Sequence, residues 1–173
     1  MEPLSTLPRT TWSERTSFAL GGLLTLIGGL TCIGWLIRNP LLLQLFADAA
    51  PIKFNETLSL FLIGIALLGV AFRSRYSHWI ALIPAALNLL TIAQNNFNLK
   101  WQLENLFIGE HLLDNINYSG GTPDIVSLCL GLISLGLFWS GVQIVPRYRL
   151  FTKAVIGSIS ISVGLSTLLG YAA

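Results

Sequence analysis

The chain has 173 residues, of which only 10% are charged, and its mean hydropathy is +0.70. This composition is typical of membrane proteins, and a net charge of +2 is too small to indicate a nucleic-acid-binding protein. The two cysteines, Cys32 and Cys129, both lie in apolar stretches, where a small thiol usually serves packing rather than metal binding or redox chemistry.

Five stretches of the chain contain no Asp, Glu, Lys or Arg. In chain order they are Ser17–Ile37, Thr57–Phe72, His78–Ala93, Ile125–Val145 and Ala154–Ala173. A helix needs about 20 residues to cross the hydrocarbon core, and the second and third stretches reach that length with their polar flanks in the headgroup layer. A helix of a soluble protein would carry a charged face. The sequence therefore predicts an all-α integral membrane protein with five transmembrane helices, a cytoplasmic N-terminal segment at 1–16 and a transmembrane domain at 17–173.

The distribution of Lys and Arg predicts the direction in which the chain crosses the membrane. With the N-terminus in the cytoplasm, seven of the ten basic residues lie inside, and only Arg38, Lys53 and Lys100 lie outside. Cytoplasmic loops carry the excess of basic residues in membrane proteins. We therefore expect a cytoplasmic N-terminus.

The segments that follow the first and third spans resemble each other. Each contains a short apolar run, with Gln-Leu-Phe at 44–46 and Asn-Leu-Phe at 105–107, which predicts an interfacial helix on the outer leaflet. The next span then opens near a proline, with Asn55 and Asp124 as the expected N-caps. The fifth span starts a third unit of this kind. We therefore expect the protein to continue past Ala173 and to complete a six-helix bundle.

The most specific pattern surrounds the second span. Gly34-Trp35 and Asn39-Pro40 precede it, and the run Ala50–Gly64 reads APIKFNETLSLFLIG. Together these residues resemble the N-terminal membrane regions of bacterial sensor histidine kinases and diguanylate cyclases. The run Leu90–Phe107 and the loosely matching Pro123–Ser127 extend the resemblance along the chain. The resemblance implies a sensory domain in the bacterial inner membrane that passes its signal to a cytoplasmic output domain.

The third span carries a polar face. Asn88, Thr91 and Asn95 are three and four residues apart, so they share one side of a helix. With Asn55 and Glu104 they are the candidate ligand-binding residues, which we expect to line a cavity open to the outer side. The alternative is that these side chains only join helices, since an interhelical hydrogen bond in a membrane is worth about 0.6 kcal/mol.

The sequence predicts no catalytic residues, no cofactor and no metal. His111 with Glu110 and Asp114 is too small a ligand set for a metal site, because a second histidine is missing. No span contains a lysine, and no nucleophile with a base, phosphate-binding loop or pair of haem ligands is evident.

These observations favour a sensory input module of a bacterial signal-transduction protein, which senses an apolar, amphipathic or membrane-derived signal on the outer side. The module is not itself an enzyme. The alternative is a small repeat-built transporter or channel, which predicts interrupted helices or an intramembrane charge, and a membrane-embedded enzyme ranks last. Expected partners are the lipid bilayer, the output domain and a second copy of the chain, because Ser158, Ser162 and Ser166 form a small-residue face on the fifth span. Nucleic acid is not expected.

Overall fold

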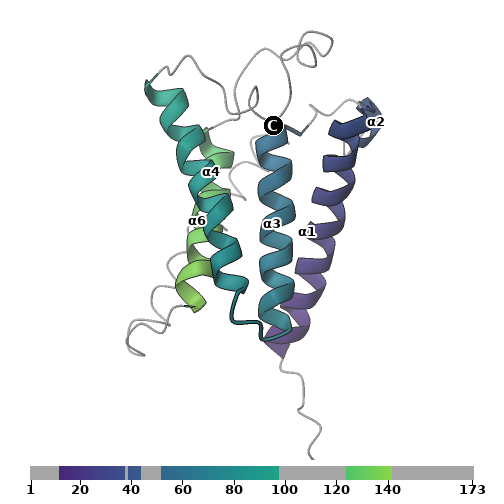
Figure 1. Cartoon of the computed structure of the whole chain (residues 1–173), viewed down its shortest axis with the longest axis vertical. Coiled ribbons are helices and arrows are strands. Elements are labelled where there is room, and N and C mark those ends of the chain that lie inside the picture. The colour runs from purple at the N-terminus through teal and green to yellow at the C-terminus, as the bar shows by residue number, and fades with distance from the viewer. Residues whose placement is uncertain (1–11, 38, 44–51, 98–123, 142–173) are drawn as a thin grey trace, which may run out of the picture.

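The computed structural model of the chain describes residues 12–37, 39–43, 52–97 and 124–141, and all regular secondary structure in these ranges is helical. Its elements are α1 (Trp12–Ile37), α2 (Pro40–Leu43), α3 (Phe54–Ala71), α4 (Ser77–Phe97) and α6 (Asp124–Gly141). Figure 1 shows the four long helices as an up-and-down bundle, with α1 and α4 rising and α3 and α6 descending. We call the end at which α3 and α6 begin the upper end, and the opposite end the lower end.

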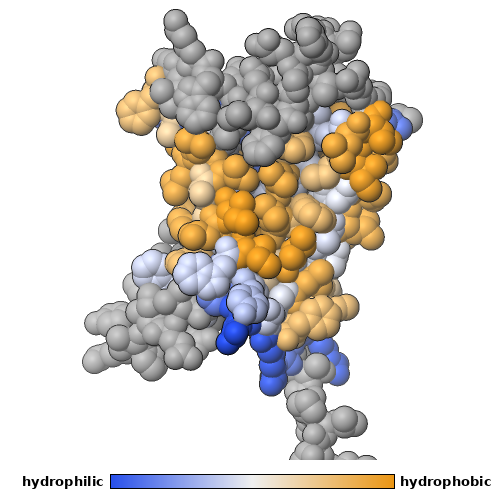
Figure 2. Space-filling view, viewed as in Figure 1, coloured by the Kyte–Doolittle hydropathy of each residue, from blue (hydrophilic) through white to orange (hydrophobic). Residues whose placement is uncertain are grey.

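Three of these helices are long and apolar enough to cross a membrane: Glu14–Ile37 within α1, and the whole of α3 and α4. Helix α6 is apolar but shorter. Large apolar side chains are exposed around the bundle, among them Leu36 and Phe97, and Figure 2 shows an apolar band above a hydrophilic lower end. In lipid such side chains face hydrocarbon, and helices satisfy their own backbone hydrogen bonds.

The first three predicted spans are therefore confirmed as helices of spanning length. Helix α1 begins at Trp12, so its first turn lies within the segment assigned from the sequence to a cytoplasmic tail. The fourth predicted span is present as α6, which the structure describes as far as Gly141. The fifth, at 154–173, lies outside the described residues. Within the described residues, the structure thus supports three helices of spanning length, and the five predicted from the sequence are not shown.

Helices α1 and α3 approach each other closely because glycines line their contact. A Cβ atom on Gly28 would lie 2.5 Å from the backbone nitrogen of Phe61, and one on Gly64 would lie 2.5 Å from the nitrogen of Thr25. Small residues let the backbones of transmembrane helices touch, which matters in lipid because no hydrophobic force drives such helices together. The remaining surface of α3 is available to α4 and α6, both of which it also contacts.

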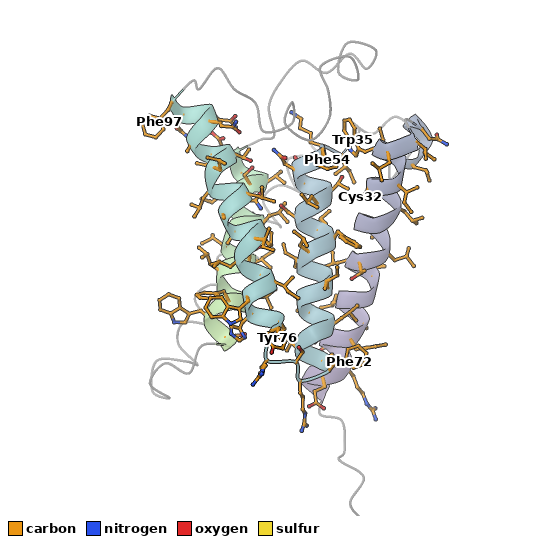
Figure 3. The ribbon with its side chains drawn as sticks, viewed as in Figure 1. Cys32, Trp35, Phe54, Phe72, Tyr76 and Phe97 are labelled. Atoms are coloured by element: carbon orange, nitrogen blue, oxygen red, sulfur yellow. The ribbon has the colours of Figure 1, made fainter. Side chains whose placement is uncertain are left out.

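At the upper end, contacts around Trp35 hold the connection from α1 to α3. The indole Nε1 of Trp35 donates to the carbonyl of Ile52 at 3.0 Å, and its ring meets Phe54 edge-on, with centroids 6.3 Å apart. Figure 3 shows these two rings side by side where α1 and α3 meet. The backbone nitrogen of Ile52 also donates to the carbonyl of Leu43, the last residue of α2, at 2.9 Å. These bonds determine where α3 starts.

One expectation for this region needs correction, and another is tested only in part. The N-cap of α3 is Lys53, which makes no side-chain capping bond, so the assignment of Asn55 as the cap is wrong. Asn55 is the second residue of α3 and is buried, because its side chain faces α4 rather than its own helix end. The expected first interfacial helix is present only as α2, which ends at Leu43 and buries that residue. The region 44–51 and the second interfacial helix lie outside the described residues.

At the lower end, Arg73 ties the α3–α4 turn to the start of α1. Arg73 has φ 55°, the left-handed region that favours glycine. Its guanidinium donates from Nε at 2.9 Å and from Nη2 at 2.6 Å to Oε1 of Glu14. Beside this ion pair, the rings of Phe18 and Phe72 meet edge-on at 5.9 Å. Polar and aromatic contacts therefore close the lower end of the α1–α3 pair.

Candidate functional site

Helices α3 and α4 meet through polar side chains in their upper halves. The Nδ2 atom of Asn88 donates to Ser59 Oγ at 2.9 Å. Nearer the upper end, Nδ2 of Asn55 donates to Thr91 Oγ1 at 3.5 Å, the long limit of a hydrogen bond. None of these four side chains is more than 4% exposed. Polar residues four apart on α3 and three apart on α4 thus face each other inside the bundle.

Pro84 borders these contacts on the lower side. It lies inside α4, where its missing N–H leaves one rung of the helix ladder unmade. One turn later, the Asn88 side chain also donates to the carbonyl of Pro84, at 2.8 Å. Helix α4 continues through this point to Phe97. A single side chain therefore links the α3–α4 contact to the backbone carbonyl of the proline inside α4.

Helix α6 closes the other side of the cluster by packing mainly against α4 and, to a lesser extent, against α3. A Cβ atom on Gly131 would lie 3.5 Å from Cβ of Asn88, an ordinary contact. At the upper rim, Nδ2 of Asn95 donates to Oδ1 of Asp124, the first residue of α6, at 2.7 Å. Between these two contacts lies Ser127, which is fully buried. We define the upper polar cluster as Asn55, Ser59, Asn88, Thr91 and Ser127.

Some buried oxygens of the described residues have no hydrogen-bond partner. They are Asn55 Oδ1, Thr57 Oγ1 and Ser127 Oγ. Other hydroxyls of the bundle donate to a carbonyl of their own helix, as Ser134 does to Leu130 at 2.6 Å. A buried polar atom without a partner costs about 1–3 kcal/mol. Such atoms need an explanation in a native protein, for example a bound water or ligand, and two of them belong to the cluster.

The structure brings together three of the five candidate ligand-binding residues, namely Asn55, Asn88 and Thr91. Asn95 is exposed at the upper rim, where it bonds to Asp124 rather than joining the other three. Glu104 lies outside the described residues. Whether these residues bind a ligand stays a prediction.

Sequence reasoning missed Ser59 and Ser127. A single serine in an apolar helix belongs to no repeating pattern, and its role depends on which helix lies opposite. Their spacing to other buried small polar residues (Asn55 to Ser59, Ser127 to Ser134) is the one signal that could have marked them, because it places each pair on one helix face.

The described residues offer little for metal or redox chemistry. No group of three His, Cys, Asp or Glu that could hold a metal ion occurs in that part of the chain. Cys32 and Cys129 are unbridged thiols on α1 and α6, each partly buried. What the site can do chemically is therefore to donate and accept hydrogen bonds. Comparison of the chain with protein-family models, with curated proteins and with solved structures finds no match.

Proposed function

We propose that the chain is the membrane-embedded input module of a bacterial signal-transduction protein, which senses an apolar, amphipathic or membrane-derived signal on its outer side and passes it to a cytoplasmic output domain. The observation that carries this proposal is the upper polar cluster, which joins α3 to α4 through hydrogen bonds, includes Ser127 of α6, and holds buried oxygens without partners. A polar network that served only to rigidify the bundle would be expected to satisfy all of its groups. Buried oxygens without a partner are expected at a site that is filled in one state of the protein and empty in another.

The energetics of the cluster suit a two-state response. An interhelical hydrogen bond in a membrane protein is worth about 0.6 kcal/mol, so α3, α4 and α6 can exchange partners at low cost. A signal shifts such an equilibrium only if it binds the two arrangements unequally. Because Asn88 bonds to both Ser59 and the carbonyl of Pro84, a rearrangement of the cluster reaches the α4 backbone at Pro84. We expect the upper part of α4 to move relative to its lower part.

The proposal includes an orientation in the bacterial inner membrane, with the upper end outside and the lower end in the cytoplasm. Arg15, Arg73 and Arg75 are exposed at the lower end, where hydrophilic side chains gather in Figure 2, and basic residues concentrate on the cytoplasmic side of membrane proteins. We further propose five spans in repeated helix–interfacial helix–helix units. We also propose that two copies of the chain form a homodimer through the fifth span. The output domain would be a histidine kinase or a diguanylate cyclase.

The full-length protein in inverted membrane vesicles tests this function. Phosphate transfer from ATP, or cyclic dinucleotide formation from GTP, reports the output. The double variant Asn55→Leu/Asn95→Leu removes one bond to α4 and one to α6. Loss of these two hydrogen bonds removes about 1.2 kcal/mol of stabilisation from the arrangement that contains them. This free energy changes the ratio of active to inactive protein about eightfold. The control is Asn96→Leu, because Asn96 is exposed and bonds only within α4 to Ile92, at 2.9 Å.

Two outcomes would contradict the proposal. Wild-type output from a stably inserted double variant would exclude the cluster as the place where the signal acts. A full-length protein that carries no output domain on the cytoplasmic side would overturn the sensory function itself.

A further inference from the structure

The hydroxyl of Ser127, like that of Thr57 on α3, has no hydrogen-bond partner, whereas other buried hydroxyls of the bundle do. Thr31, Thr91 and Ser134 each donate to a carbonyl four residues earlier in their own helix, at 2.6–3.0 Å. This is the usual way in which a hydroxyl satisfies itself inside a membrane helix. Ser127 is equally buried, at 0% exposure, yet its oxygen has no partner. It is therefore available to bond something other than its own backbone.

The packing of α6 places Ser127 at the same depth as Asn55. Helices α4 and α6 run antiparallel, and their register follows from two contacts: Asn95 with Asp124, and Asn88 with Gly131. Each helix advances by seven residues between these two contacts, so Ser127 lies level with Ile92, the neighbour of Thr91. Asn55 bonds to Thr91 from the α3 side. Asn55 and Ser127, which both have an oxygen without a partner, thus lie at nearly the same depth on two helices that both pack against α4 and also contact each other.

The unmet atoms define the chemistry of an occupant. Asn55 Oδ1 can only accept a hydrogen bond, whereas the Ser127 hydroxyl can donate one. An alcohol matches both, because its O–H donates to Asn55 while its oxygen accepts from Ser127. An uncharged ligand fits best, since Asn55, Thr91 and Ser127 carry no charge themselves and are buried, and burying a charge without a charged partner is costly. The surface around the bundle is apolar, so an occupant that enters from the bilayer must be soluble in lipid.

We propose that Asn55 and Ser127 form a binding site for the hydroxyl group of an uncharged, lipid-soluble alcohol. The site is reached from the bilayer between α3 and α6. That the alcohol is the sensed signal rests on the proposed function, but its binding does not require an output domain.

Photolabelling tests the site directly. The full-length protein in phosphatidylethanolamine/phosphatidylglycerol vesicles is irradiated with an octanol that carries a diazirine, and labelled peptides are identified by mass spectrometry. We expect label on α3 near Asn55 and on α6 near Ser127. At subsaturating probe, Ser127→Ala and Asn55→Leu should each reduce this label about fivefold, the effect of one net hydrogen bond of about 1 kcal/mol. Ser134→Ala is the matched control, because it removes an equally buried hydroxyl of α6 that is already bonded.

Competition separates a hydrogen-bonding site from simple partitioning. Unlabelled octanol should displace the probe, and octane at equal membrane concentration should not. Equal displacement by octane, or equal label in Ser127→Ala and Ser134→Ala, would overturn the proposal. Absence of label from both helices would mean that only water occupies these atoms, and would also overturn it. Each of these results leaves the output assay unaffected, so the two proposals can fail separately.

Discussion

The close contact of α1 with α3 makes a strong prediction about Gly28. Replacement by alanine adds one methyl group, which would lie 2.5 Å from the nitrogen, 2.7 Å from Cα and 2.9 Å from Cβ of Phe61. Ordinary contacts of a Cβ atom begin at 3.4 Å, so the helices must separate by roughly 0.9 Å (3.4 minus 2.5) at this point. Two of the opposing atoms are backbone, and no change of rotamer can relieve the clash.

The same helix offers a control for the helix-forming preference of alanine. A Cβ on Gly22 would meet nothing within 4 Å. Alanine stabilises a helix relative to glycine by about 1 kcal/mol, and this gain is common to Gly22→Ala and Gly28→Ala. The difference between the two variants therefore isolates the clash. Overpacking costs about 1–3 kcal/mol, so we expect Gly28→Ala to be less stable than Gly22→Ala by about 2 kcal/mol.

Unfolding of the purified protein in mixed micelles by increasing sodium dodecyl sulfate, followed by circular dichroism, measures this difference. Gly64→Ala should behave like Gly28→Ala, because its Cβ would lie 2.5 Å from the nitrogen of Thr25. If Gly28→Ala and Gly22→Ala unfold within about 0.5 kcal/mol of each other, a typical effect of a surface substitution, the close approach of α1 and α3 is refuted.

Three further predictions concern the cluster, the lower turn and the orientation. A double-mutant cycle of Ser59→Ala and Asn88→Ala should give a coupling free energy of about 0.6 kcal/mol in the same unfolding assay, and a coupling of zero would exclude their hydrogen bond. Arg73→Gly should be more stable than Arg73→Ala by about 1 kcal/mol, because alanine keeps the strain of a positive φ that glycine relieves; equal stabilities would contradict the left-handed turn. A cysteine at position 119 should react with an impermeant maleimide in intact cells, whereas one at the exposed Ser74 should not. Labelling of position 74 from outside would reverse the proposed topology.

The polar face of α4 shows which features of the site the residue spacing alone can predict. Spacings of three and four residues placed Asn88, Thr91 and Asn95 on one side of a helix, and the structure confirms that Asn88 and Thr91 are buried together. Asn95 follows the same spacing but is exposed, because α4 extends past the point where α3 covers it and meets the start of α6 instead. The spacing determines a shared face, and the length of the neighbouring helices determines how much of that face is buried.

Asn55 shows the limit of local rules. Its position after a proline and two residues before an apolar stretch is typical of an N-cap, and a cap depends only on residues nearby in sequence. In the structure the start of α3 is determined by Trp35 and Ile52, and Asn55 turns to Thr91, 36 residues later in the chain. A long-range contact thus displaced the local preference.

The sequence by itself determined that the described part of this protein is a set of apolar helices. The reason is that uncharged stretches of such length must satisfy their backbone hydrogen bonds internally in lipid, and a helix does so with no other part of the chain. Which helices touch, and through which residues, was decided only by the tertiary structure. Gly28 lies against Phe61 and Gly64 lies against Thr25 because backbones approach where side chains are small, and that complementarity depends on two distant segments at once.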